Sequence, residues 1–181
     1  MDAIKINEAM KKVKPGLEKY LNIMNIVNEV DVSKDENFQK AFNGFYRIRQ
    51  RSSIFYEKYY SFMESYKSRD ISFDKTLLYF YSELGRVEAS FSSKLVATIN
   101  PNLPIWDSVV LKNLNLSQPH YYSKNRIQEI INLYDKINQW YQKFILTDEG
   151  KEIISIFDKN YPDTPITEVK KIDFVLWQIR E

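Results

Sequence analysis

A chain of 181 residues with 44% apolar and 28% charged side chains is long enough to bury one core, and no change in composition marks a second domain. The lack of cysteine and the single histidine exclude disulfides, thiolate metal sites and histidine metal clusters, so neither a metal nor a cofactor is expected. The net charge of +2 permits a polyanionic partner without requiring one.

The first part of the chain is predicted to be helical. Residues 1–15 lack the uncharged apolar run of a signal peptide, and no segment approaches the roughly 18 to 20 apolar residues that span a bilayer. We therefore expect a cytoplasmic protein that does not enter a membrane. Apolar residues at helical spacing predict one helix over residues 2–13, which Pro15 ends, and a second helix over residues 17–30.

Residues 38–66 are the most aromatic part of the chain. Their rings recur every three or four positions, which predicts a helix with a wide apolar stripe, broken near Gly44 or Ser52. Arg47 and Arg51 are predicted to lie one turn apart on the same side of that helix. Rings interleaved with guanidinium groups can stack on bases and neutralise phosphates, although such a stripe is more often core.

Residues 77–116 hold the side chains that most invite a chemical interpretation. We expect a helix that breaks at Gly85, a second helix ending at Asn100, a loop bracketed by two prolines, and a third helix that opens at Asp107. Lys94 lies on the second helix. If the helices pack as an antiparallel pair, the amine and the carboxylate face one cleft; otherwise they are a surface lysine and a helix cap.

The last third is predicted to be helical as well. Residues 115–122 form a loop containing His120, which could donate to a substrate, although a lone loop histidine is usually structural or exposed. Ser123 is expected to cap a long amphipathic helix, Thr147 the next, and Thr164, followed by a proline, the last. With no strand predicted, we expect an all-α fold of eight to ten helices in a single globular domain.

Two short runs resemble the signatures of a known family. The run from Trp106 to Lys112, WDSVVLK, is similar to the motif that holds the aspartate of the helix-hairpin-helix DNA glycosylases, the superfamily of 8-oxoguanine glycosylase. The run from Leu84 to Ser90, LGRVEAS, is similar to the family's hairpin, with Gly85 at its proline position and Arg86 and Glu88 at its two glycine positions. Phrases such as FNGFYRIR and ITEVKKIDFVLWQ also resemble a group of uncharacterised bacterial proteins distantly similar to 8-oxoguanine glycosylases.

This resemblance implies a glycosylase-like helical fold and an enzyme that excises a flipped, damaged base from duplex DNA. Asp107 would stabilise positive charge on the sugar. Ser90 falls at the position of the family's lysine, as in the monofunctional adenine glycosylase, and Lys94, one turn further on, is either a displaced nucleophile or unrelated. The other residues implied are Trp106 and Tyr46 around the base and Arg47, Arg51, Arg86 and Lys112 against phosphates. The alternative is a non-catalytic module on the same frame that binds nucleic acid or a protein partner.

Overall fold

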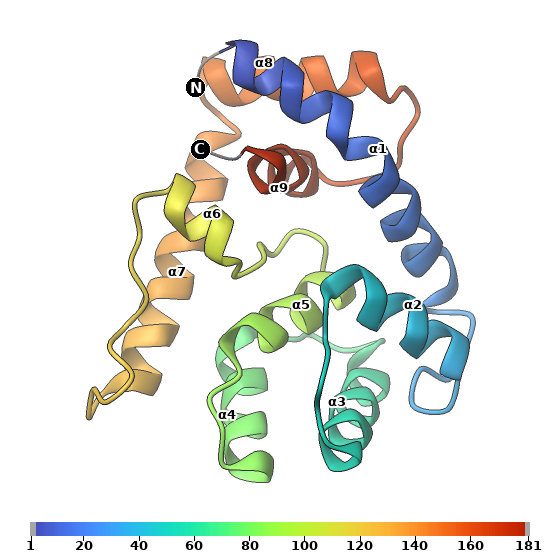
Figure 1. Cartoon of the computed structure of the whole chain (residues 1–181), viewed down its shortest axis with the longest axis vertical. Coiled ribbons are helices and arrows are strands. Elements are labelled where there is room, and N and C mark those ends of the chain that lie inside the picture. Colours follow the sequence, from blue (N-terminus) through green and yellow to red (C-terminus); the bar gives the residue numbers. More distant parts are fainter. Residues whose placement is uncertain (1–2, 180–181) are drawn as a thin grey trace. The chain divides into compact units, whose positions relative to one another are not determined.

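The computed structural model describes residues 3–179, and this part of the chain is built of helices and loops (Figure 1). Its nine helices are α1 (Ala3–Ile26), α2 (Glu36–Tyr46), α3 (Ser53–Tyr66), α4 (Phe73–Leu84), α5 (Ala89–Ile99), α6 (Ser108–Asn113), α7 (Arg126–Phe144), α8 (Asp148–Asn160) and α9 (Glu168–Gln178). No strand lies between residues 3 and 179. The all-α class and the expected number of helices are therefore confirmed.

The contacts of the chain gather in two compact units. The terminal unit comprises residues 1–14 and 101–181, and the internal unit comprises residues 15–100. Helix α1 contributes its first half to the terminal unit and its second half to the internal one. This division into two units does not test the expectation that residues 1–181 form one domain, which stays a prediction.

Aromatic side chains form the core of the internal unit, as the stripe over residues 38–66 predicts. Phe42, Tyr59 and Phe80, from three successive helices, are completely buried, and the rings of Tyr59 and Phe80 stack with centroids 5.4 Å apart. Helix α2 ends at Arg47, which adopts a left-handed conformation, and α3 begins where the Ser52 hydroxyl accepts from the Phe55 amide. The stripe is thus core, and its break falls near Ser52, one of the two predicted places.

A helical hairpin completes the internal unit. Helix α4 ends at Gly85, whose φ of 64° is readily reached only without a side chain, and whose N–H donates to the Tyr81 carbonyl. Helix α5 follows after a short turn and packs against α4. The predicted break at Gly85 is confirmed.

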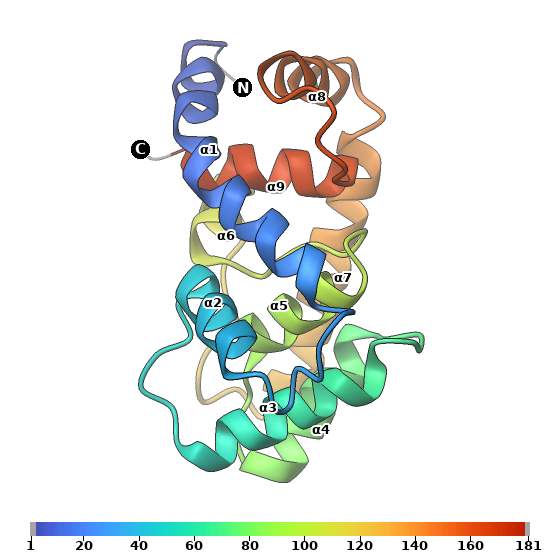
Figure 2. The same cartoon turned by 90° about the vertical axis from the view of Figure 1, so that its right-hand side faces the viewer.

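The terminal unit is assembled around α9, which packs against α6 and α8 (Figures 1 and 2). Side-chain donors tie loops to this frame: the Tyr134 hydroxyl donates to the Pro104 carbonyl at 2.8 Å, and the Tyr161 hydroxyl to the Met10 carbonyl at 2.6 Å. The second bond fastens the first half of α1 to the loop after α8.

Three predicted helix boundaries are wrong. Helix α1 continues through Pro15, because losing one backbone donor costs less than exposing the apolar side chains of Val13 and Leu17, which are buried on either side. The Ser123 hydroxyl accepts from the Asn125 amide and donates to Glu129, but α7 starts only at Arg126, after Asn125 at the N-cap position. Helix α9 is capped by Thr167 and not by Thr164: the Thr167 hydroxyl accepts from the Lys170 amide and donates to the Pro101 carbonyl.

Candidate functional site

Asp107 lies where the sequence predicts it, at the N-terminus of α6. Its Oδ1 accepts from the amide of Val109 at 2.8 Å, so the carboxylate satisfies one of the helix's unpaired donors. The side chain is only partly buried, so solvent still reaches it. This geometry serves as a helix cap, and it also presents a fixed negative charge at the surface of the terminal unit.

A buried polar cluster of the terminal unit, absent from the sequence-based site, lies within electrostatic range of Asp107. The Tyr141 hydroxyl of α7 donates to Asp173 Oδ1 at 2.9 Å, and Lys170 Nζ contacts Asp173 Oδ2 at 3.1 Å. Lys170 is only 1% exposed. Burial, followed by the charge of Asp173 and more weakly that of Asp107, raises the pKa of Tyr141 well above its usual range.

Sequence analysis missed this cluster because its members look like ordinary parts of amphipathic helices. The signal was a charged pair three residues apart inside the apolar run VKKIDFVLW, where Lys170 and Asp173 share the face of the surrounding buried residues. A charge on a buried face needs a partner of opposite sign, and Lys170 and Asp173 are each other's partners.

Lys94 is held by the internal unit in a way that accounts for its presence on α5. The side chain is 8% exposed, and its Nζ donates to the carbonyl of Tyr46, the last residue of α2, at 3.0 Å. Nζ also lies 5.2 Å from the centre of the Phe91 ring. A cation at the C-terminus of a helix satisfies an unpaired carbonyl and opposes the helix dipole, which is a structural role.

Lys94 and Asp107 belong to different units, and the expectation that they share one cleft stays a prediction. Ser90 lies in the first turn of α5, half-buried, where its carbonyl accepts from the Ser93 hydroxyl. The two predicted pocket aromatics, Trp106 and Tyr46, are 3% and 1% exposed, so as placed they line the interior.

The turn before α5 is where the family's hairpin would receive a phosphate, and here it holds a carboxylate. Glu88 stands at the N-cap of α5 and is buried. Its Oε2 lies 3.3 Å from Nη2 of Arg51, and its Oε1 lies 3.5 Å from Nε of Arg86. Burial raises the pKa of Glu88, and the two arginines partly offset this rise. The Glu88 side chain makes no capping hydrogen bond to α5, and its ionic partners are these two arginines.

Arg47 and Arg51 do not share a helix face as predicted, because both lie in the loop between α2 and α3. Arg51 is engaged within the protein, with its guanidinium 4.7 Å from the centre of the Phe91 ring and paired with Glu88. Arg47 is exposed, as is the side chain of Lys112 in the last turn of α6.

The loop between α6 and α7 carries the plainest exposed aromatic feature of the terminal unit. We define residues 114–125 as the tyrosine loop; Figure 1 shows it leaving α6 and turning back at the start of α7. Tyr121 and Tyr122 near its tip are 70% and 82% exposed. His120, expected to lie in a loop, precedes them, and its Nδ1 accepts from the Tyr122 amide at 3.3 Å.

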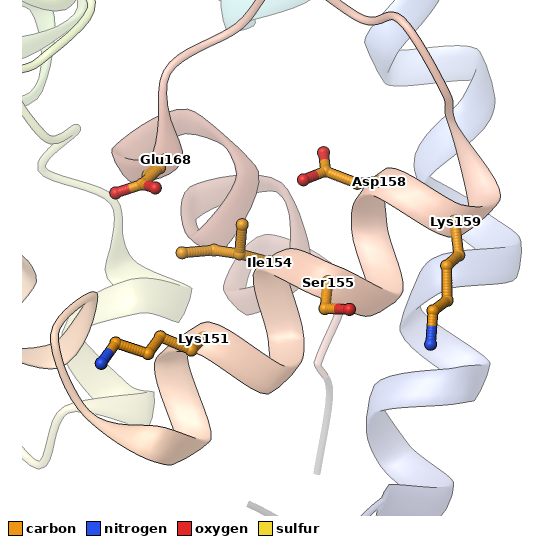
Figure 3. Close-up of a pocket in the computed structure, with 6 residues that line it drawn as sticks. All are labelled: Lys151, Ile154, Ser155, Asp158, Lys159 and Glu168. Carbon is orange, nitrogen blue, oxygen red and sulfur yellow. The ribbon is translucent and has the colours of Figure 1, made fainter.

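Two open grooves lie within the units, and neither is lined by a predicted site residue. The groove of the terminal unit, of about 420 Å³, lies between α8 and the start of α9 (Figure 3). Lysines and carboxylates both line it, at Lys151, Lys159, Asp158 and Glu168, with no excess of either sign. The groove of the internal unit, of about 680 Å³, lies along α2 and α3, and its charged residues are Glu36, Lys40 and Glu57.

Neither a membrane-spanning helix nor a metal site is found between residues 3 and 179. No helix of this range combines the length and apolar character needed to cross a membrane. No group of three or more histidine, aspartate or glutamate side chains in it is placed to hold a metal ion.

Comparison with known proteins finds no family model, no curated protein and no solved structure that matches this chain. The likeness to helix-hairpin-helix glycosylases therefore rests on the two short runs quoted above, and the function that it implies stays a proposal.

Proposed function

We propose that this chain is a nucleic-acid-binding module on a helical frame, and that Lys94 takes no part in chemistry. The observation that supports binding most directly is the distribution of charge between α6 and α7. From residue 108 to residue 128 the chain has three cationic side chains, Lys112, Lys124 and Arg126, and no aspartate or glutamate. Because 24 acidic residues are spread over 181 positions, an acid-free stretch of this length with exposed lysines at 112 and 124 is a local concentration of positive potential.

The same stretch also carries two exposed aromatic side chains, Tyr121 and Tyr122. Phosphates are attracted by lysine and arginine, and bases stack on aromatic faces, so a surface that combines the two matches both parts of a nucleotide. By contrast, Arg51 and Arg86 near the turn before α5 both pair with Glu88, so the phosphate contact of the family's hairpin is not part of this proposal.

Binding to duplex DNA can be tested by fluorescence anisotropy at increasing salt concentration. If the cations of the stretch contact phosphates, the logarithm of the association constant should fall linearly with the logarithm of salt concentration, by about 0.9 for each phosphate contacted. Lys124→Ala should lower that slope by about one contact. Lys159→Ala, which removes an exposed lysine of α8, is the matched control and should leave the slope unchanged. If the wild-type protein binds no DNA at low salt, the proposal is wrong.

A second function, base excision, is favoured by one observation: the carboxylate of Asp107 is fixed by the Val109 amide yet still partly exposed. A carboxylate in this position could stabilise a positively charged sugar or activate water. Duplexes carrying oxidised, deaminated or alkylated bases would lose the base with wild-type protein and keep it with Asp107→Asn. Borohydride should trap no covalent adduct, because Lys94 Nζ is held by the Tyr46 carbonyl in a side chain only 8% exposed, and a Schiff-base nucleophile must reach the sugar carbon.

A further inference from the structure

The two tyrosines at the tip of the tyrosine loop are held in place rather than left mobile by the surrounding backbone. The amide of Ser123 donates to the His120 carbonyl at 3.1 Å, which closes a turn around Tyr121 and Tyr122. The next turn is closed by the amide of Arg126, which donates to the Ser123 carbonyl at 3.3 Å. These two turns restrain the backbone of the tip, which lowers the entropy lost when it binds a partner.

Side chains fix the rings as well. The guanidinium of Arg126 lies 4.8 Å from the centre of the Tyr121 ring, and the rings of Tyr121 and Tyr122 meet edge to face at 86°, with centroids 5.1 Å apart. The His120 ring lies 5.8 Å from that of Tyr122. Cation–π and edge-to-face contacts set the direction of both rings while leaving most of their surface in solvent.

The charged residues nearest the tyrosines in the sequence are cations. Lys124 and Arg126 follow the tyrosines directly, and the first acidic residue beyond them, Glu129, accepts from the Ser123 hydroxyl at 2.8 Å. Two rings that are exposed, oriented and flanked by cations match an unpaired nucleotide, whose base offers a face for stacking and whose phosphate offers a negative charge. A paired base within a duplex has both faces covered by its neighbours and offers no such surface.

We propose that the tyrosine loop binds unpaired bases by stacking on Tyr121 and Tyr122, and that this chain prefers nucleic acid with a single-stranded or bulged stretch to continuous duplex. This proposal rests on the proposed nucleic-acid binding and adds the class of partner. The loss of one stacked base on alanine substitution is worth about 5- to 150-fold in affinity. The double variant Tyr121→Ala/Tyr122→Ala should therefore lose at least about fivefold for a single strand, and much less for duplex.

The test compares a labelled single strand, a duplex and the same duplex with one bulged base, at low and at moderate salt. Tyr122→Phe keeps the ring and should bind as wild type, whereas the double alanine variant should not. Tyr81→Ala removes a tyrosine that is 45% exposed on α4 and is the matched control. A 2-aminopurine at the bulged position gives a direct readout, because stacking on tyrosine quenches its fluorescence.

The possible results distinguish a failure of base stacking on the tyrosine loop from a failure of the proposed nucleic-acid binding. Equal affinity for duplex and single strand, unchanged in the double variant, overturns the inference and leaves the binding module standing. Failure to bind any of the three nucleic acids overturns both. Binding to vesicles of anionic phospholipid through the same tyrosines, without binding to oligonucleotides, would identify the loop as a membrane contact and would also overturn the inference.

Discussion

Replacing Asp173 by alanine should destabilise the protein more than almost any other single polar change. The substitution removes the carboxylate that lies 3.1 Å from the ammonium of Lys170, a side chain 1% exposed, and it also takes the acceptor from the Tyr141 hydroxyl. Breaking a buried ion pair from one side costs about 3 to 5 kcal/mol. For a chain of this size each kcal/mol corresponds to about 2 to 4 °C, so the melting temperature should fall by about 6 to 20 °C.

Thermal unfolding followed by circular dichroism measures this directly. Asp135→Ala, which removes an exposed acid of α7, should change stability by no more than about 0.5 kcal/mol. The triple change Lys170→Met, Asp173→Leu and Tyr141→Phe should recover most of the loss, because apolar side chains of similar volume commonly replace a buried ion pair without cost. A melting temperature of Asp173→Ala within about 2 °C of wild type would refute the reasoning, since the pair would then not be buried as described.

Three further outcomes follow from the internal and terminal units. Burial raises the pKa of Glu88 above its ordinary value of 4.5, so the folded state keeps this proton to a higher pH than the unfolded chain does. The free energy of unfolding should therefore fall as pH rises from about 4.5 through the raised pKa of the folded state. Glu88→Gln should flatten that part of a plot of melting temperature against pH. Gly150→Ala should lower the free energy of unfolding, measured with denaturant, by about 1 to 3 kcal/mol, because its new Cβ would collide with the backbone carbonyl of Phe144. Gly44→Ala, which has open space around it in α2, should raise the free energy of unfolding by about 0.4 to 1 kcal/mol. Lys94→Met should lower the melting temperature by removing the cation that caps α2, and an unchanged value would contradict that role.

Local signals predicted much of the fold. Gly85, Asp107 and Thr147 each end or begin a helix where expected, because a left-handed glycine or an N-cap oxygen acts within a few residues of its own position. The same local logic failed at Pro15 and Thr164. There the outcome depended on contacts far along the chain: burial of the residues on either side of Pro15, and the bond from Thr167 to the Pro101 carbonyl.

Sequence patterns predicted less of the candidate site, because the role of a charged side chain depends on which groups it contacts in the folded protein. Nothing near Lys94 in the sequence indicates that its ammonium meets the carbonyl of Tyr46, 48 positions away. In the same way, Asp173 and Tyr141 are joined across 32 positions. The net charge gave no preference for a nucleic-acid partner. The acid-free stretch from residue 108 to residue 128 is visible in the sequence but was not part of the predicted site, and only the structure shows that its two adjacent tyrosines are exposed.

Carboxylates of the chain itself already occupy the N-termini of two helices, and this would limit how a nucleic acid of the proposed kind is held. Asp35 accepts from the Phe38 amide at 2.7 Å, and Asp107 accepts from the Val109 amide. A carboxylate at such a position satisfies the donors and cancels the positive end of the dipole that would otherwise attract a phosphate. Backbone amides are therefore poorly placed to grip a duplex at α2 and α6, and we expect the proposed binding to depend mainly on cationic side chains and exposed rings. Side-chain cations give binding that weakens steeply with salt, whereas stacking is the component that salt leaves largely intact. Raising the salt concentration should thus increase the fraction of the remaining affinity that depends on Tyr121 and Tyr122.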